Sequence, residues 1–114
     1  MPEQGDIVLI PVPFTDLSST KRRPVIVVSN DGYNRQRHDI VVVAMTSNPS
    51  AGRYAFTISS SDLERGKLNR PGQIRVDKLY TLSQSIIVKT FGRVNAATLD
   101  RIRGLLHDLT AQKP

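Results

Sequence analysis

The chain has 114 residues, which suits one domain, residues 1–114, with a hydrophobic core of its own. It contains no cysteine, which excludes disulfides and cysteine-ligated metal sites, and its formal charge of +6 favours polyanionic partners such as nucleic acid. The first residues lack the basic start and apolar run of a signal peptide, and no apolar run approaches the roughly 18 residues of a membrane helix. We therefore expect a cytoplasmic protein without a membrane contact.

Short β-rich segments follow one another along most of the chain. The first alternates, with Val8, Ile10 and Val12 on one face, and its prolines Pro11 and Pro13 place it at a sheet edge or a bend. The second and third are nearly continuous apolar runs, which is typical of buried strands. The predicted strands are residues 6–14, 24–29, 40–47, 53–59, 72–82 and 86–94.

The connections between these strands are polar. Residues 15–23 form a long loop, residues 30–39 are turn-rich with room for one helical turn, and residues 60–66 contain a possible capped helical turn. Along the strand at residues 72–82, the alternation predicts that Ile74, Val76 and Leu79 face inward.

The last segment has helical periodicity, and Asn95 is suited to cap its N-terminus. One apolar stripe is formed by Leu99, Ile102, Leu105, Leu106 and Leu109. Closely spaced strands followed by one helix predict a mainly β fold, a small antiparallel barrel with the C-terminal helix packed on it.

Several common chemistries have no motif in this sequence. Glycine-rich dinucleotide and phosphate loops are absent, as is the serine elbow of hydrolases. The two histidines, His38 and His107, are far apart and lack the spacing of metal ligands, so we interpret both as surface residues. We therefore expect no metal and no cofactor.

Three cations stand where the second predicted strand begins: Lys21, Arg22 and Arg23 precede Pro24. The simplest interpretation is a solvated basic turn, since charge runs usually face water. The functional interpretation is an anion site, because Pro24 holds Arg23 in an extended conformation and so gives its side chain a defined direction.

Hydrogen-bonding side chains end the third predicted strand, where Thr46, Ser47 and Asn48 could bind a phosphate or simply form a turn. On the strand at residues 72–82, Gln73 and Arg75 share the polar face, which is either an ordinary solvated face or a floor that contacts RNA bases and phosphates.

Five segments together resemble the MazF/PemK family of toxins: GDIVLIPVPFTDL, RRPVIVVSN, VVVAMTS, QIRVDKLYTL and FGRVNAATLDRIRGLL. They occur in the family's order and extend from residue 5 to about residue 109. The resemblance implies an SH3-like barrel, usually a homodimer, that acts as the toxin of a type II toxin–antitoxin system. Its partner would be an antitoxin whose disordered tail folds across the RNA groove.

Most members of that family cut single-stranded RNA at short sequences, without the ribosome and without a metal, and leave 2′,3′-cyclic phosphate and 5′-hydroxyl ends. By resemblance, Arg23 and Thr46 are the catalytic residues. RNA-binding residues would be Lys21, Arg22, Ser47, Asn48, Gln73 and Arg75. Several members carry a glutamate in the first long loop, where this chain has only Asp16 as a candidate proton acceptor.

Two alternatives stay open from the sequence. The barrel also resembles that of CcdB-type toxins, which inhibit DNA gyrase through C-terminal residues that include a terminal aromatic, and the tail LTAQKP has none. The second alternative is a basic RNA-binding module without catalysis.

Overall fold

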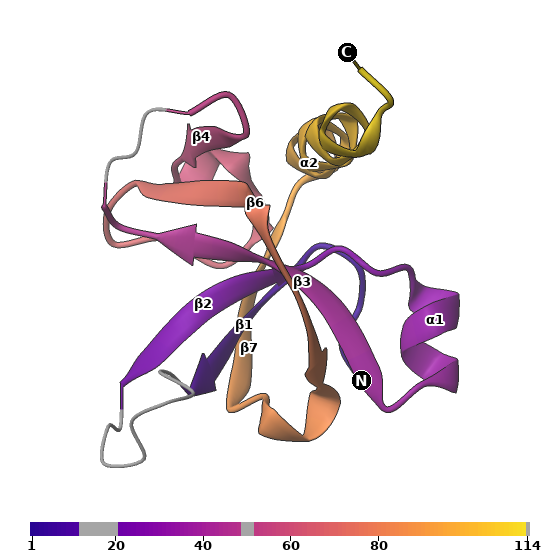
Figure 1. Ribbon diagram of the computed structural model, residues 1–114. Coiled ribbons are helices and arrows are strands. Elements are labelled where there is room, and N and C mark those ends of the chain that lie inside the picture. Colours follow the sequence, from indigo (N-terminus) through magenta and orange to yellow (C-terminus); the bar gives the residue numbers. More distant parts are fainter. Residues whose placement is uncertain (12–20, 49–51, 114) are drawn as a thin grey trace.

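Seven strands form one curled antiparallel sheet in the computed structural model, which describes residues 1–11, 21–48 and 52–113. The order across the sheet is β4-β6-β3-β2-β1-β7-β5 (Figure 1). The strands are β1 (Asp6–Pro11), β2 (Arg22–Val27), β3 (Asp39–Thr46), β4 (Ala55–Ile58), β5 (Leu63–Arg65), β6 (Gly72–Ser83) and β7 (Lys89–Val94). The helices are α1 (Asp31–Gln36) and α2 (Ala96–Thr110), with 3₁₀ turns η1 (Ser60–Asp62) and η2 (Gln84–Ile86). The predicted mainly β class with a C-terminal helix is confirmed.

Strand β6 bends sharply and gives the sheet its curl (Figure 1). Along β3, Val43 pairs with Leu79 while the next residue, Ala44, pairs with Arg75, so residues 76–78 have no partner on β3. Instead, the Val76 N–H donates to the Tyr54 carbonyl oxygen at 2.9 Å. Such a bulge bends a strand and increases its twist, which lets one strand serve both halves of the curled sheet.

Apolar side chains pack on both faces of the central strands. Within β2, Ile26 packs in the core that includes Ile102 of α2, whereas Val25 and Val27 pack in a second core beneath Leu82, Ile86 and Ile87. Strands β1 and β3 divide their side chains in the same way. This burial on two faces explains the nearly continuous apolar sequence of β2 and β3.

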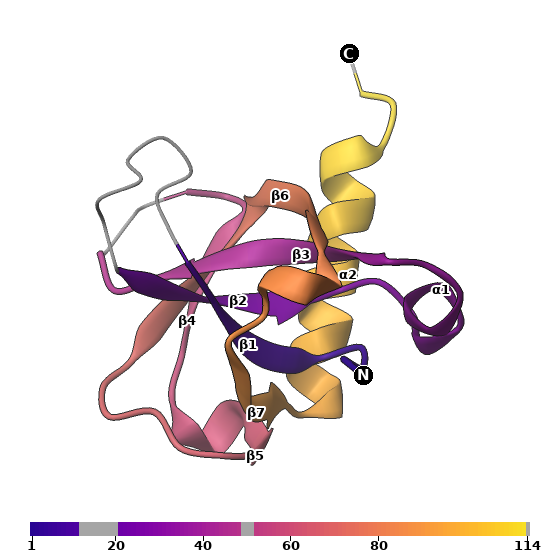
Figure 2. The same cartoon turned by 90° about the horizontal axis from the view of Figure 1, so that it is seen from below.

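Helix α2 covers one of these cores, and its C-terminal end extends beyond the sheet (Figure 2). The predicted cap is confirmed: the Asn95 side-chain oxygen accepts a hydrogen bond from the Thr98 N–H at 2.9 Å. Four of the five predicted stripe residues pack toward the sheet. The fifth, Leu109, is 37% exposed because the last turn of the helix extends beyond the sheet. No helix among the described residues combines the length and apolar character that a membrane crossing requires.

Some local expectations were wrong. Leu79 does not face inward but is 44% exposed, because β4 pairs only with residues 72–75 and β6 is a sheet edge beyond its bend. The last strand begins at Lys89 rather than Ile86, since η2 occupies the predicted start. Strand β5 was not predicted, whereas the capped turn at η1 is confirmed by its capping box. Predicted strand residues 12–14, Val12 and Pro13 among them, lie outside the described residues.

An ion-pair network around the buried carboxylate of Asp6 joins the N-terminal segment to β7 and β5. The Arg93 Nε donates to the Asp6 Oδ1 at 2.9 Å, and its Nη2 donates to the Glu3 Oε2 at 2.9 Å, while the Glu64 carboxylate lies 3.6 Å from Nη1. Asp6 is only 5% exposed, and it raises the pKa of the Arg93 guanidinium. A buried carboxylate requires such a partner, because leaving its charge unpaired costs several kcal/mol.

We expect Arg93→Met to lower the free energy of unfolding by about 2 kcal/mol, because it leaves the Asp6 carboxylate buried without a cation. Urea denaturation at neutral pH measures this change. The matched control is Arg103→Met on α2, where the side chain is 63% exposed and its guanidinium forms only a 3.6 Å pair with Asp100. An exposed pair contributes less than about 1 kcal/mol. Equal losses in the two variants would contradict the assigned role of Arg93.

Candidate active site

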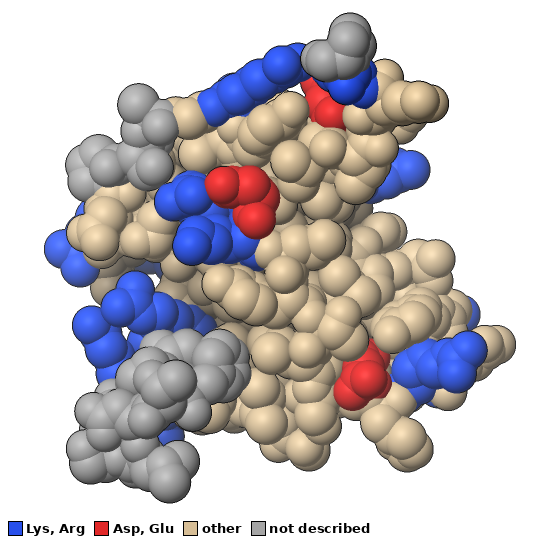
Figure 3. All heavy atoms as spheres, in the orientation of Figure 1, with Lys and Arg blue, Asp and Glu red and all other residues tan. Residues whose placement is uncertain are grey.

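The start of β2, the end of β3 and the start of β6 meet at one end of the sheet. Strand β3 runs antiparallel to both of its neighbours, with Thr46 opposite Gln73 of β6 and Ala44 opposite Val25 of β2. The antiparallel register therefore places the cationic start of β2 beside Thr46. In Figure 3, Lys and Arg side chains gather at the left of the molecule, where these strand ends lie.

A pocket of about 440 Å³ opens at this meeting point. Its described lining residues are Lys21, Arg22, Arg23, Pro24, Met45, Thr46, Ser47, Asn48, Arg70, Pro71 and Gly72. One pocket is thus lined by both clusters that the sequence indicated. These are the cations at the start of β2 and the polar residues at the end of β3. The predicted pair Arg23 and Thr46 is brought together by the pairing of β2 with β3.

The pocket continues along β6 into two further depressions that share Arg23 and Met45 with it. One, of about 280 Å³, is lined by Arg23, Ala44, Met45, Thr46, Asn48, Arg75, Lys78 and Tyr80. The other, of about 110 Å³, is apolar and is lined by Ile10, Arg23, Pro24, Val25, Ala44, Met45 and Tyr80. We call the pocket and these two depressions the groove.

The electrostatic character of the pocket is strongly cationic. Of its lining residues within the described ranges, four are Lys or Arg and none is Asp or Glu. Arg22, Arg23 and Arg70 form no ion pair with any residue in the described part of the chain. Uncompensated guanidinium groups repel one another and attract anions, and their planar fork of donors matches phosphate oxygens.

The Thr46 hydroxyl has a defined position at the end of β3. Its Oγ1 accepts a hydrogen bond from the Asn48 N–H at 3.1 Å, and the residue is partly buried. Because the oxygen acts as the acceptor in this contact, the hydroxyl hydrogen stays available for donation to an anion. The geometry thus combines an Arg23 guanidinium and a Thr46 hydroxyl donor at one pocket.

The remaining predicted residues differ in how they relate to this groove. Arg75 lies in it, but its guanidinium is paired in a bidentate contact with Asp77, at 2.9 Å and 2.8 Å. Gln73 lines none of the three depressions; its Nε2 donates to the Thr57 hydroxyl oxygen of β4 at 3.4 Å. Asp16, the predicted proton acceptor, lies outside the described residues.

The sequence interpretation missed three groove residues with a charged or hydroxyl-bearing side chain. Lys78 and Tyr80 reach the groove because the bend of β6 directs them there, and no local sequence signal marks that bend. Arg70 did carry a signal, since the Arg70–Pro71 pair repeats the order of Arg23–Pro24. Among the described residues, no group of three His, Cys, Asp or Glu side chains is placed to hold a metal ion.

Comparisons with known proteins agree on the fold. The model of a family described as PemK-like, MazF-like toxin of type II toxin–antitoxin system matches residues 3–110. A mycobacterial endoribonuclease in complex with its cognate antitoxin is similar with a TM-score of 0.80 at 23% identity, covering 100% of both chains. A MazE–MazF complex from Deinococcus radiodurans has a TM-score of 0.78 at 23% identity, covering 98% of each chain. No curated protein matches the sequence.

The Arg75–Asp77 pair yields a test by titration. The hydrogen bond from Arg75 lowers the pKa of the Asp77 carboxyl below its ordinary value of 3.8. The stabilisation from this pair is therefore complete above pH 3.8 and is lost as the pH falls through the lower pKa of the folded state. We expect an NMR titration to show the Asp77 midpoint below 3.8 and to show it rising in Arg75→Gln. An unchanged midpoint in that variant would mean that the pair does not form in solution.

Proposed function

Because the chain belongs to the family of PemK-like, MazF-like toxins of type II toxin–antitoxin systems, we propose that it is an endoribonuclease that cleaves single-stranded RNA at short sequences. The observation that supports this most directly is the pocket that holds the Thr46 hydroxyl and Arg23, which forms no ion pair with a described residue. The described lining of this pocket contains four Lys and Arg residues and no carboxylate. We further propose that cleavage needs neither a metal nor the ribosome.

The proposed reaction is an attack of the ribose 2′-hydroxyl on the adjacent phosphate. The 2′-oxygen–phosphorus bond forms, the bond from phosphorus to the 5′-oxygen breaks, and the products carry 2′,3′-cyclic phosphate and 5′-hydroxyl ends. Negative charge develops on the non-bridging oxygens during this step. The Arg23 guanidinium would stabilise that charge, and loss of one such donor typically costs about 3–4 kcal/mol of transition-state stabilisation.

Thr46 would hold a non-bridging oxygen and so orient the phosphate for in-line displacement. Two protons must also move: one leaves the 2′-hydroxyl and one reaches the departing 5′-oxygen. Arginine is a poor proton acceptor because it stays protonated in proteins. Asp16 is our candidate for the acceptor, since the described pocket residues supply no carboxylate.

The neighbouring side chains would bind the RNA rather than react with it. Lys21 and Arg22 would attract the backbone, whose phosphates dominate the affinity of most nucleic-acid complexes. Ser47 and Asn48 would donate hydrogen bonds from the end of β3. Gln73 and Arg75 are proposed contacts on the strand that borders the groove.

We also propose the partners that similar proteins have. Neighbouring structures are complexes of such toxins with antitoxins, and an acidic disordered antitoxin tail would be attracted to the same cationic groove. A homodimer is the proposed assembly, and cytoplasmic RNA is the proposed target.

We expect purified protein to cut a long single-stranded RNA in the presence of EDTA at a recurring short sequence, leaving 5′-hydroxyl ends. Arg23→Ala should reduce the cleavage rate by about 100-fold or more, and Thr46→Ala by about tenfold or more, because each removes a donor to the reacting phosphate. Mapping of the product ends measures both the site and the chemistry.

Arg103→Ala, on the exposed face of α2, is the matched control and should cut at the wild-type rate. Intact RNA with the wild type, across several RNAs, would contradict the nuclease. A DNA supercoiling assay and an RNA-binding assay would then distinguish gyrase inhibition from binding without cleavage.

A further inference from the structure

We propose that Arg70 binds a second RNA phosphate, the one next to the scissile phosphate, so that the pocket holds two consecutive phosphates. This inference rests on the proposed function, because it assumes that the scissile phosphate lies between Arg23 and Thr46. It adds a positioning residue that comes from a different part of the sheet.

The position of Arg70 follows from the strand order. Strand β3 lies between β2 and β6, so Arg23 approaches the pocket from one side of Thr46 and Arg70, just before β6, approaches from the other. Adjacent strands are about 4.8 Å apart, which separates the backbones of β2 and β6 by roughly 10 Å. Two guanidinium groups that reach inward across this width can serve two neighbouring phosphates.

The backbone around Arg70 is anchored on both sides. Two residues earlier, the Leu68 N–H donates to the Ser60 hydroxyl oxygen at 2.8 Å, and the Ser60 hydroxyl donates back to the Leu68 carbonyl oxygen at 3.1 Å. Two residues later, Gly72 begins β6 and pairs with Ile58 of β4. Pro71 also restricts Arg70 to extended conformations. The guanidinium therefore extends from a fixed point.

Nothing in the described protein uses this guanidinium. The ion pairs within residues 1–11, 21–48 and 52–113 engage Arg75, Arg93 and Arg103, and neither an ion pair nor a hydrogen bond involves the Arg70 side chain. A cation that repels Lys21, Arg22 and Arg23 without a carboxylate partner weakens the folded state. Its charge is balanced if an anion enters the pocket.

The number of cations exceeds what one phosphate can balance. Each phosphodiester carries one negative charge, whereas Arg22, Arg23 and Arg70 all line the pocket without an ion pair to a described residue. A chain with consecutive phosphodiesters brings further negative charges within reach of the remaining cations. This contact exists equally before and during the reaction, so it should lower KM without changing kcat.

The test uses an oligonucleotide that contains the cleaved sequence and a set of copies in which one linkage other than the scissile one is an uncharged methylphosphonate. With the all-phosphate substrate, Arg70→Gln should raise KM on the order of tenfold at unchanged kcat. The KM of the wild type should rise by a similar factor when one particular linkage, directly beside the cut, is neutral. The KM of Arg70→Gln should not rise further with that same substrate.

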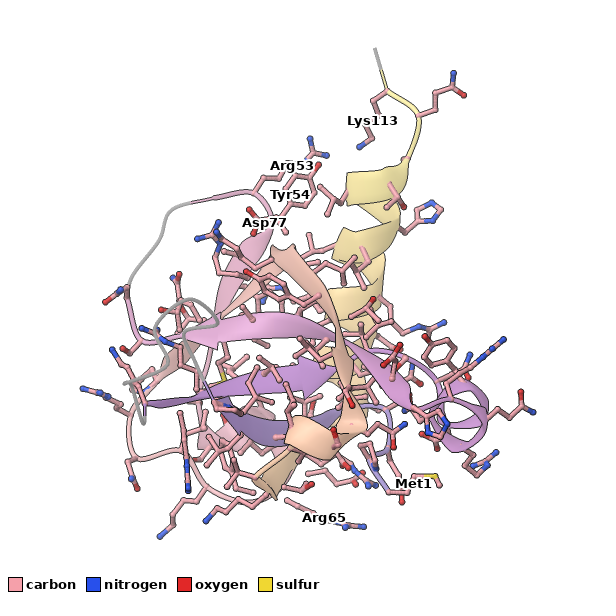
Figure 4. All side chains as sticks on the ribbon, turned by 60° about the horizontal axis from the view of Figure 1, so that its bottom comes forward. Met1, Arg53, Tyr54, Arg65, Asp77 and Lys113 are labelled. Atoms are coloured by element: carbon pink, nitrogen blue, oxygen red, sulfur yellow. The ribbon has the colours of Figure 1, made fainter. Side chains whose placement is uncertain are left out.

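The matched control is Arg65→Gln, which removes a cation from the same stretch of chain but outside the pocket. Figure 4 shows Arg65 at the lower edge of the molecule and Asp77 of β6 in its upper half. Its KM should equal that of the wild type. An unchanged KM in Arg70→Gln, or a loss that is the same whichever linkage is neutral, would overturn the proposal.

A second readout separates this inference from the nuclease itself. Binding to single-stranded RNA is measured against salt concentration, where each phosphate contact contributes about 0.7 to the slope of the log–log plot. Arg70→Gln should lower the slope by about that amount, and Arg65→Gln should leave it unchanged. If the wild type binds RNA without cutting it and the slope is still lower in Arg70→Gln, the proposed nuclease activity is wrong but the Arg70 contact with a phosphate is supported. An unchanged slope would reject the contact.

Discussion

The antiparallel pairing of β3 with β2 on one side and with β6 on the other is the constraint on which the site depends. It fixes which strand ends meet, and so it brings Arg23, Thr46 and Arg70 to one pocket although they lie far apart in the sequence. A shift of one residue in either register would turn every side chain of that strand to the opposite face and exchange the residues of two cores, each close-packed around its own side chains. The cores therefore protect the geometry of the pocket.

Burial on both faces also explains why the polar residues occur only where the strands end. Ile26 and Val43 pack on one side of the sheet while Val25 and Val42 pack on the other, so neither β2 nor β3 has a position in its middle for a hydrated charge. Solvent reaches these strands at their ends, where Arg22, Arg23 and Thr46 lie. A site built there is rigid, since its backbone continues directly into the core.

The sequence predicted the parts of this fold that a local pattern determines. Apolar β-branched runs identified β2 and β3, and a 3.6-residue period with Asn95 as its cap identified α2. The bend of β6 could not be predicted, because residues 76–78 contain neither glycine nor proline and their lost pairing depends on contacts with β3 and Tyr54. Leu79 was misplaced for that reason.

The candidate site divides in a similar way. Arg23 and Thr46 were predicted as a pair because their motifs follow a known family order, while nothing in the residues themselves fixes the distance between them. Arg70 lies in a stretch without periodicity just before β6, and only the folded chain shows that it lines the same pocket as Thr46. Residues brought together by non-local pairing are in general the ones that a single sequence conceals.

The distribution of carboxylates gives the groove a direction. In the part of the chain that the structure describes, the acids that form ion pairs contact Arg75, Arg93 and Arg103, and none of them lines the pocket. Towards Tyr80 the charge of Arg75 is balanced by Asp77, and the adjacent cleft is apolar. The groove therefore passes from a strongly cationic region to one in which Lys78 lies beside the Tyr80 ring and an apolar cleft. A single RNA strand has the same two components, since its phosphates favour the first environment and its bases stack in the second. Double-stranded RNA keeps its bases stacked on one another, so it could fill only the cationic part.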